Sequence, residues 1–323
     1  MKKGKYCRKI VRAGCTVDVQ FTYPTRFGEG LTRAKHRKAI TEENTADDKK
    51  NGKSGGGTPT DVEAYNYELA VRKLTLILNE NFTPDDWFVT LHYEKHNRPE
   101  SIEQARRQLT VFLKELKKFY ICKELELKWV KTTAYGNHGA LHHHIVIPKG
   151  VTQRQISAVW KEVVQASIKA RPPECRALYS TGEYSALAAY FCQQAEKSGT
   201  KEKNMRRWTC SRNIKRPEPE EPKWVDKVKW QEPPAPWPGY YIETDSIRAG
   251  CNPVTGKPYL FYRMVKLPPD FTCYDNRGKR LTGKEAVKYY RENNKDFIKQ
   301  NWIDLNPEGE VIFKTEKGLR QDE

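Results

Sequence analysis

Three consecutive histidines, His142, His143 and His144, lie in a segment that is otherwise apolar from Leu141 to Ile147. Side chains alternate along a β-strand, so His142 and His144 share one face and His143 lies on the other. Two imidazoles held two residues apart on a rigid strand are spaced to bind one metal ion. The alternative is that they lie on a solvated sheet face and bind nothing. The rest of the chain favours the metal site.

A tyrosine on a predicted helix is the second reactive group. Residues from about Gly182 to Lys197 have helical spacing, and Tyr190, Gln194 and Lys197 share one face of that helix. A phenol oxygen can attack phosphorus and form a covalent phosphotyrosine, while a metal ion polarises the phosphate. We expect polar and cationic groups beside Tyr190 to lower its pKa or to hold the phosphate. A lone helical tyrosine is more often structural, so this interpretation depends on the histidine pair.

The composition favours a polyanionic partner. The chain has 323 residues and a formal net charge of +17, from 58 Lys and Arg against 41 Asp and Glu. A solvated basic surface with no such partner is the alternative. The eight cysteines include no CxxC pair, so we expect reduced thiols and a cytoplasmic protein. No apolar stretch has the length of a membrane span, so no membrane partner is expected.

The order of predicted elements indicates an α+β fold. Capping patterns at Ser101 with Gln104 and at Thr152 with Gln155 mark the starts of two helices. The expected order is helix, strand, helix, strand, strand, helix, strand, helix, at about residues 61–79, 87–93, 102–116, 125–135, 141–147, 153–168, 176–179 and 182–197. This order predicts a ferredoxin-like (RRM-like) antiparallel sheet with helices packed on one face, which leaves the other face free for a ligand.

Three regions are predicted along the chain. Residues 1–60 form a basic N-terminal arm, with an edge strand at 16–23 and a flexible Gly-rich insertion. Residues 61–216 form the central domain. Residues 217–323 form a Pro- and Trp-rich extension and a C-terminal region of unknown role, with a strand near 258–267 and a basic amphipathic helix at 284–302. We expect the tryptophans of this extension to pack onto a core rather than to stack on bases.

Four segments, taken together, resemble a known superfamily. Leu141–Ile147 resembles the histidine strand of the HUH endonucleases, and Phe88–Tyr93 resembles their first hydrophobic motif. Tyr190–Gln194 is similar to the helix that carries their nucleophile, and Ser211–Ile214, followed by Pro217, resembles a motif that trails the tyrosine. The tyrosine follows the histidines, as in rolling-circle replication initiators (Rep proteins) of bacterial mobile elements. The resemblance spans roughly residues 60 to 217.

The resemblance implies the HUH endonuclease fold and a metal-dependent enzyme that nicks and rejoins single-stranded DNA through a 5′-phosphotyrosine. His142 and His144 would bind Mg²⁺ or Mn²⁺, and Tyr190 would be the nucleophile, with Gln194 and Lys197 beside it. The family often has a glutamate as a further ligand where this chain has Ala134. His92, His138 or a water would take its place. The family's hydrophobic residue between the histidines is His143 here, and its frequent lysine is Gln194. Tyr184 lies on another helical face, which predicts a one-tyrosine mechanism.

The implied partners follow from that activity. The substrate would be single-stranded DNA at a replication-origin hairpin, and a host helicase and polymerase would act with a chain that has no helicase motif. Phosphate contacts are expected from basic residues on the helix at 102–116 and beyond the tyrosine, namely Arg106, Arg107, Lys114, Lys117 and Arg212. Two alternatives stay open: a transposase or mobilisation protein of the same superfamily, and a catalytically silent module that binds single-stranded nucleic acid. The resemblance implies a bacterial, cytoplasmic protein.

Overall fold

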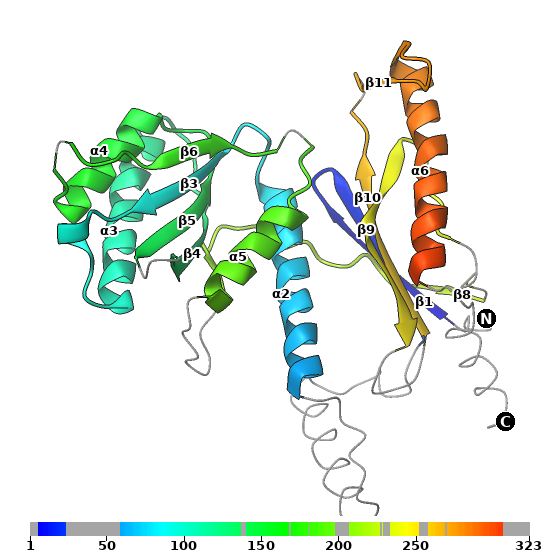
Figure 1. The fold of residues 1–323 in the computed structure, drawn as a ribbon, viewed down its shortest axis with the longest axis horizontal. Coiled ribbons are helices and arrows are strands. Elements are labelled where there is room, and N and C mark those ends of the chain that lie inside the picture. The colour runs from blue at the N-terminus through cyan, green and yellow to red at the C-terminus, as the bar shows by residue number, and fades with distance from the viewer. Residues whose placement is uncertain are drawn as a thin grey trace, which may run out of the picture. The chain divides into compact units, whose positions relative to one another are not determined.

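The computed structural model describes residues 6–23, 59–136, 140–167, 169–179, 181–197, 207–226, 228, 233–251, 258–268 and 270–305. Contacts divide the chain into two compact units (Figure 1). One unit combines Met1–Ala64 with Glu218–Glu323, and the central unit is Tyr65–Pro217. Both contain helices and antiparallel sheets, which confirms the predicted α+β class. Within the described segments, no helix has both the length and the apolar character needed to cross a membrane.

The central unit is built on one antiparallel sheet with the strand order β6-β3-β5-β4-β7. The first four of these strands have the ferredoxin-like order, and β7 extends the sheet beside β4. Its elements in chain order are α2 (Pro59–Asn81), β3 (Trp87–His92), the 3-10 helix η2 (Lys95–Asn97), α3 (Ile102–Ile121), β4 (Val130–Tyr135), β5 (Leu141–Ile147), α4 (Gln153–Val164), β6 (Glu174–Ala177), α5 (Ser185–Lys197) and β7 (Thr209–Cys210).

Local capping explains where two of these helices begin. The Ser101 side chain accepts a hydrogen bond from the Gln104 amide at the start of α3. Thr152 and Gln155 form a reciprocal capping box at the start of α4. The strand expected from residue 125 begins only at Val130. The Leu125 amide still bonds to the Tyr120 carbonyl at the end of α3, so the chain is not yet free to pair with β5.

Helices cover both faces of this sheet (Figure 1). Val89 and Ile145 point toward the cluster that contains α3 and α4. Val130 and Val146 point the other way and pack with residues of α2 and α5. The prediction of helices on one face therefore describes α3 and α4, whereas α2 and α5 lie on the face expected to be bare. That second face carries an apolar patch, and its burial brings α5 next to the histidine strand.

The other unit joins both ends of the chain in one sheet, with the order β8-β1-β2-β10-β9. Residues 6–13, predicted as part of a basic arm, form a strand of this sheet. The elements are β1 (Tyr6–Ala13), β2 (Thr16–Thr22), β8 (Lys223–Val225), β9 (Tyr240–Cys251), β10 (Pro258–Lys266), the hairpin strands β11 (Thr272–Tyr274) and β12 (Arg280–Thr282), and α6 (Gly283–Leu305). The strand near 258–267 and the helix near 284–302 lie where the sequence predicts them.

The strand predicted at the edge, β2, lies inside the sheet between β1 and β10. The reason is that both of its faces are buried: Val17 and Val19 join the apolar core, and Asp18 on the opposite face is buried against Arg263. Trp237 packs against the same core and contacts Arg12 through its ring, as expected for a packing tryptophan. Most of the Gly-rich insertion lies outside the described residues.

Candidate active site

Strand register gathers the histidines into one cleft of the central unit. His92 on β3 is directly opposite His142 on β5, and Thr90 is directly opposite His144. Because they occupy alternating positions, all four side chains lie on the face that α5 covers. The imidazole centroids of His142 and His144 are 4.7 Å apart, and those of His92 and His142 are 6.3 Å apart. They line a cleft with a volume of about 730 Å³.

Helix α5 brings Tyr190 to the same cleft. Leu187 and Phe191 are buried in the core against α2, which fixes the height and rotation of the helix. Tyr190 lies at the margin of that core and lines the cleft. Its hydroxyl oxygen is 3.0 Å from Nε2 of His144, within hydrogen-bond distance. The structure therefore brings together His142, His144 and Tyr190, the three residues that the sequence selected for chemistry.

Burial keeps the imidazoles of the cleft neutral. His144 is buried, and desolvation lowers its pKa to about 3, with smaller contributions from His142 and His92. Burial is also the main cause of the lowered pKa of His142 and of His92. Nδ1 of His144 lies 3.1 Å from the Thr90 hydroxyl. Neutral imidazole is the form that coordinates a metal ion, so these side chains have the right protonation state to be ligands.

The spacing of the histidines fits a metal ion in part. An Nε2–metal bond of ~2.1 Å puts the centroids of two imidazoles on one ion roughly 4.5–5.2 Å apart. The pair His142 and His144, at 4.7 Å, meets this requirement. His92, at 6.3 Å from His142, has to approach by about an ångström more. Its buried Nε2 has no hydrogen-bond partner, which suits an unused ligand atom. Among the described residues, no three His, Cys, Asp or Glu side chains already form a metal-binding group.

The strand neighbours of His142 explain which third ligand the fold offers. Ala134 on β4 is directly opposite His142 and fully buried, so it brings only a methyl group to the position where an acid is common in the resembled family. His92 occupies the corresponding position on the other side, on β3. His138, the other predicted substitute, lies outside the described residues. The geometry therefore singles out His92.

The middle histidine has a different role. His143 is fully buried on the opposite sheet face. Its Nε2 lies 2.8 Å from the Tyr93 hydroxyl, and its Nδ1 lies 2.8 Å from the Thr133 hydroxyl. Burial, followed by the charge of Lys131, holds its pKa well below the usual value. Two hydroxyl partners thus let a neutral imidazole occupy a position where a hydrophobic residue is usual.

The expectation that neighbours lower the pKa of Tyr190 is wrong. Burial raises it, and this effect exceeds the lowering by Arg176. Glu174 adds a further raising contribution. Gln194 is not among the residues that line the cleft, and the side chain of Lys197 lies outside the described residues. The phenol therefore stands in the cleft in its protonated form.

The basic residues predicted to hold DNA lie away from the cleft. Helix α3 packs on the sheet face opposite His142 and His144. Its side chains Arg107, Lys114 and Lys117 are exposed and Arg106 is half-buried. Arg212 is exposed just after β7, at the sheet edge beyond β4. None of these five is among the residues that line the cleft.

Several cleft residues were not selected from the sequence. Thr90 on β3, Glu174 and Arg176 on β6, and Tyr179 just beyond it all line the cleft. Register explains this, because Thr90 is opposite Glu174 and Phe88 is opposite Arg176. Arg176 lies 3.5 Å from Glu174, which also pairs with Arg171. The short charged strand gave no local signal, since only its pairing with β3 puts these groups beside the tyrosine.

Comparison with known proteins gives one family match. Residues 86–199, which contain the histidine strand and Tyr190, match the family model of replication-associated proteins of the ORF2 and phage gene II protein type. Neither a curated protein nor a solved structure shows significant similarity to this chain. The matched residues include every strand of the central sheet except β7. The central unit is thus similar to replication-associated proteins, which is consistent with a replication initiator.

Proposed function

We propose that this protein is a metal-dependent nicking and joining enzyme of the HUH type. It would cleave one DNA strand through a 5′-phosphotyrosine on Tyr190 and so initiate rolling-circle replication of a plasmid, phage or integrative element. The observation that carries this proposal is the 3.0 Å separation between the Tyr190 hydroxyl and Nε2 of His144, in a cleft that also contains His142 and His92.

The proposed step exchanges one phosphodiester for another. The phenol oxygen of Tyr190 forms a bond to phosphorus as the bond from phosphorus to the 3′ oxygen of the preceding nucleotide breaks. In net terms the phenolic proton is transferred to that 3′ oxygen. The products are a 5′-phosphotyrosine and a free 3′-hydroxyl, which can prime synthesis. Because one phosphate ester replaces another, the reverse step rejoins the strand.

The residues of the cleft divide the work of this step. His142 and His144, with His92, would hold a divalent ion such as Mg²⁺ or Mn²⁺, which polarises the scissile phosphate and offsets its developing charge. Nε2 of His144 serves one partner at a time, so its hydrogen bond to Tyr190 keeps the hydroxyl in the cleft before DNA binds. Arg176 at the cleft wall is the cation placed to contact a phosphate oxygen.

The family match favours replication over the alternatives from the same superfamily. In this proposal the substrate is single-stranded DNA exposed at an origin hairpin, and a host helicase and polymerase extend the new 3′ end. A transposase or a mobilisation protein would use the same chemistry. Replication of a plasmid that carries the gene with its own origin distinguishes them, because only the initiator supports it.

Covalent capture of DNA tests the chemistry. The protein is incubated with Mn²⁺ and 5′- or 3′-labelled oligonucleotides from its own origin region, then denatured. We expect a DNA adduct that keeps the label on the 3′ side of the nick, and its loss in Tyr190→Phe. Tyr179→Phe is the matched control, because it removes another phenol of the same cleft. An adduct that persists in Tyr190→Phe but disappears in Tyr179→Phe moves the nucleophile and contradicts the proposal.

One observation favours a second candidate, a DNA-binding module without catalysis. The described residues contain no group of three metal-ligating side chains, and both nitrogens of His144 already have partners. Calorimetric titration with Mn²⁺ separates the two candidates. Binding that is lost in His142→Ala supports the enzyme. An absence of binding, together with undiminished affinity for single-stranded DNA, supports the silent module.

A further inference from the structure

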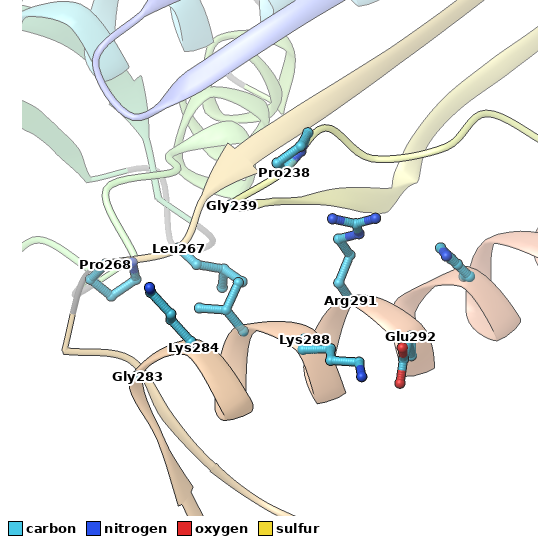
Figure 2. A pocket seen from close by; sticks show the side chains of 11 residues that line it. Pro238, Gly239, Leu267, Pro268, Gly283, Lys284, Lys288, Arg291 and Glu292 are labelled. Carbon is cyan, nitrogen blue, oxygen red and sulfur yellow. The ribbon is translucent and has the colours of Figure 1, made fainter.

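A cationic groove lies in the unit formed by the two ends of the chain, which contains none of the residues proposed for catalysis. It has a volume of about 470 Å³ and runs along one face of α6. Pro238, Gly239, Leu267 and Pro268 form its opposite wall (Figure 2). The Leu267 amide donates to the Gly239 carbonyl at 2.9 Å, which joins the two segments of that wall.

Four basic side chains line this groove, all from α6: Lys284, Lys288, Arg291 and Lys295. Their spacing of four, three and four residues puts them in one stripe along the helix. Figure 2 shows Lys284 extending beside Pro268 and Arg291 reaching toward the segment of Pro238 and Gly239. Glu292 is the single acidic residue of the lining.

These cations are available to an external partner. Among the described residues, none of the four has a hydrogen bond or an ion pair within the protein. Lys284, Lys288 and Lys295 are exposed, and Arg291 is half-buried. Asn294, on the next face of α6, instead bonds both backbone groups of Ile242 and anchors the helix to β9. The helix thus uses one face for attachment and presents the basic stripe beside it.

We propose that this groove binds the phosphate backbone of duplex DNA without reading its sequence. The stripe is ~16.5 Å long from Lys284 to Lys295. It can therefore follow about five phosphates of one strand at ~3.4 Å each along the duplex axis. A rigid row of cations suits regularly spaced phosphates. The lining contains no aromatic side chain, whereas sites for single strands commonly stack bases on aromatic rings. The choice of DNA as the polyanion rests on the proposed function, but the site and its test are separate from the nicking cleft.

The test measures salt-dependent binding to a labelled 30-bp duplex of arbitrary sequence, in a Tyr190→Phe background. The variant Lys288→Gln/Arg291→Gln removes two cations of the groove. We expect duplex affinity to fall about 10- to 30-fold near 0.15 M salt, and the slope of log K against log salt to flatten by about 1.8. Affinity for a single-stranded oligonucleotide should change less than threefold. Thermal melting checks that the variant is folded.

The matched control is Arg277→Gln/Lys279→Gln, which removes two exposed cations from the β11–β12 hairpin of the same unit. It should leave duplex binding within about twofold. Equal weakening by both double variants means that net charge, not the groove, drives binding, and overturns the inference. So does an unchanged slope in the groove variant, or a tighter association with anionic phospholipid vesicles than with the duplex. In the wild-type Tyr190 background, the groove variant should still form the adduct on a short oligonucleotide, so the two proposals fail independently.

Discussion

At the scale of single residues, the imidazole of His144 is held from both sides. Its Nδ1 faces the Thr90 hydroxyl at 3.1 Å, and its Nε2 faces the Tyr190 hydroxyl at 3.0 Å. If Nδ1 donates to Thr90, the lone pair of Nε2 points toward Tyr190. That is also the tautomer that leaves Nε2 able to coordinate a metal ion. Thr90 therefore sets the orientation of the group on which the proposed chemistry depends.

Substitution of Thr90 by valine tests this orientation. Valine keeps the branched shape but removes the hydroxyl, so we expect Thr90→Val to slow adduct formation on the order of 10-fold and to weaken Mn²⁺ binding. The measurement is the initial rate of adduct formation over a range of Mn²⁺ concentrations. Thr132→Val is the control, because Thr132 flanks His144 on the other strand and bonds to the Arg207 carbonyl. Equal losses in the two variants would show that general packing, not the hydroxyl on Nδ1, matters.

The sequence predicted the residues whose signal is local. His142 and His144 are two positions apart on one strand, and Tyr190 lies on a helix with an apolar face, so type and spacing were enough to select them. Thr90 and Arg176 have ordinary neighbours in the sequence. They enter the cleft only because β3 pairs with β5 on one side and with β6 on the other.

At the scale of elements, β4 contains a lysine where a strand faces the core. Lys131 is half-buried on the α3 side of the sheet, and its ammonium lies 4.7 Å from the Trp129 ring centroid. Burial, and secondly the nearby charge of Arg106, lower the pKa of Lys131 to about 8. The strand therefore contains a cation whose charged form the folded state disfavours.

This lowered pKa predicts that stability rises with pH. Between the folded pKa of about 8 and the ordinary value of 10.5, the unfolded chain binds more protons than the folded one. The free energy of unfolding should therefore increase by on the order of 1 kcal/mol from pH 7.5 to 9.5. Urea unfolding of the whole protein measures it. Lys131→Met should remove the slope and stabilise the protein at pH 7.5, while the exposed Lys117→Met should retain it. A flat profile in the wild type contradicts the prediction.

Element boundaries were predictable where capping chemistry is local. Ser101 and Thr152 begin α3 and α4 as their sequence patterns indicate. The start of β4 was not predictable from alternation, because residues 125–129 follow the turn that ends α3 and have the wrong geometry for pairing with β5. The packing of α2 and α5 on the second sheet face also depended on tertiary burial, which strand alternation alone does not reveal.

At the scale of the whole molecule, one buried ion pair joins segments from the two ends of the chain. Arg263 on β10 donates from Nε at 2.6 Å and from a terminal nitrogen at 3.0 Å to the two carboxylate oxygens of Asp18 on β2. The two side chains are 4% and 0% exposed, so neither charge can fall back on water. Pairing of β2 with β10 across some 240 intervening positions has no local signal, which is why the sequence predicted an edge strand and separate end regions.

Breaking this pair should destabilise one unit and spare the other. Asp18→Asn leaves a buried, uncompensated guanidinium, at a cost of about 3–5 kcal/mol. Hydrogen exchange should show lost protection in β2 and β10 and unchanged protection in β3 and β5. The double variant Asp18→Leu/Arg263→Met, which removes both charges, should recover most of the protection. Uniform loss across both sheets would mean that the two units unfold as one.

The interleaving of the two units has a consequence for synthesis on the ribosome. The hairpin of β1 and β2 emerges first, but the strand that pairs with the other edge of β2 is made only after the entire Tyr65–Pro217 unit has emerged. The nascent chain thus carries an unpaired, apolar strand edge throughout that interval. Polypeptides released early would keep this edge exposed to aggregation or proteolysis, so only chains translated through β10 reach a fully paired state.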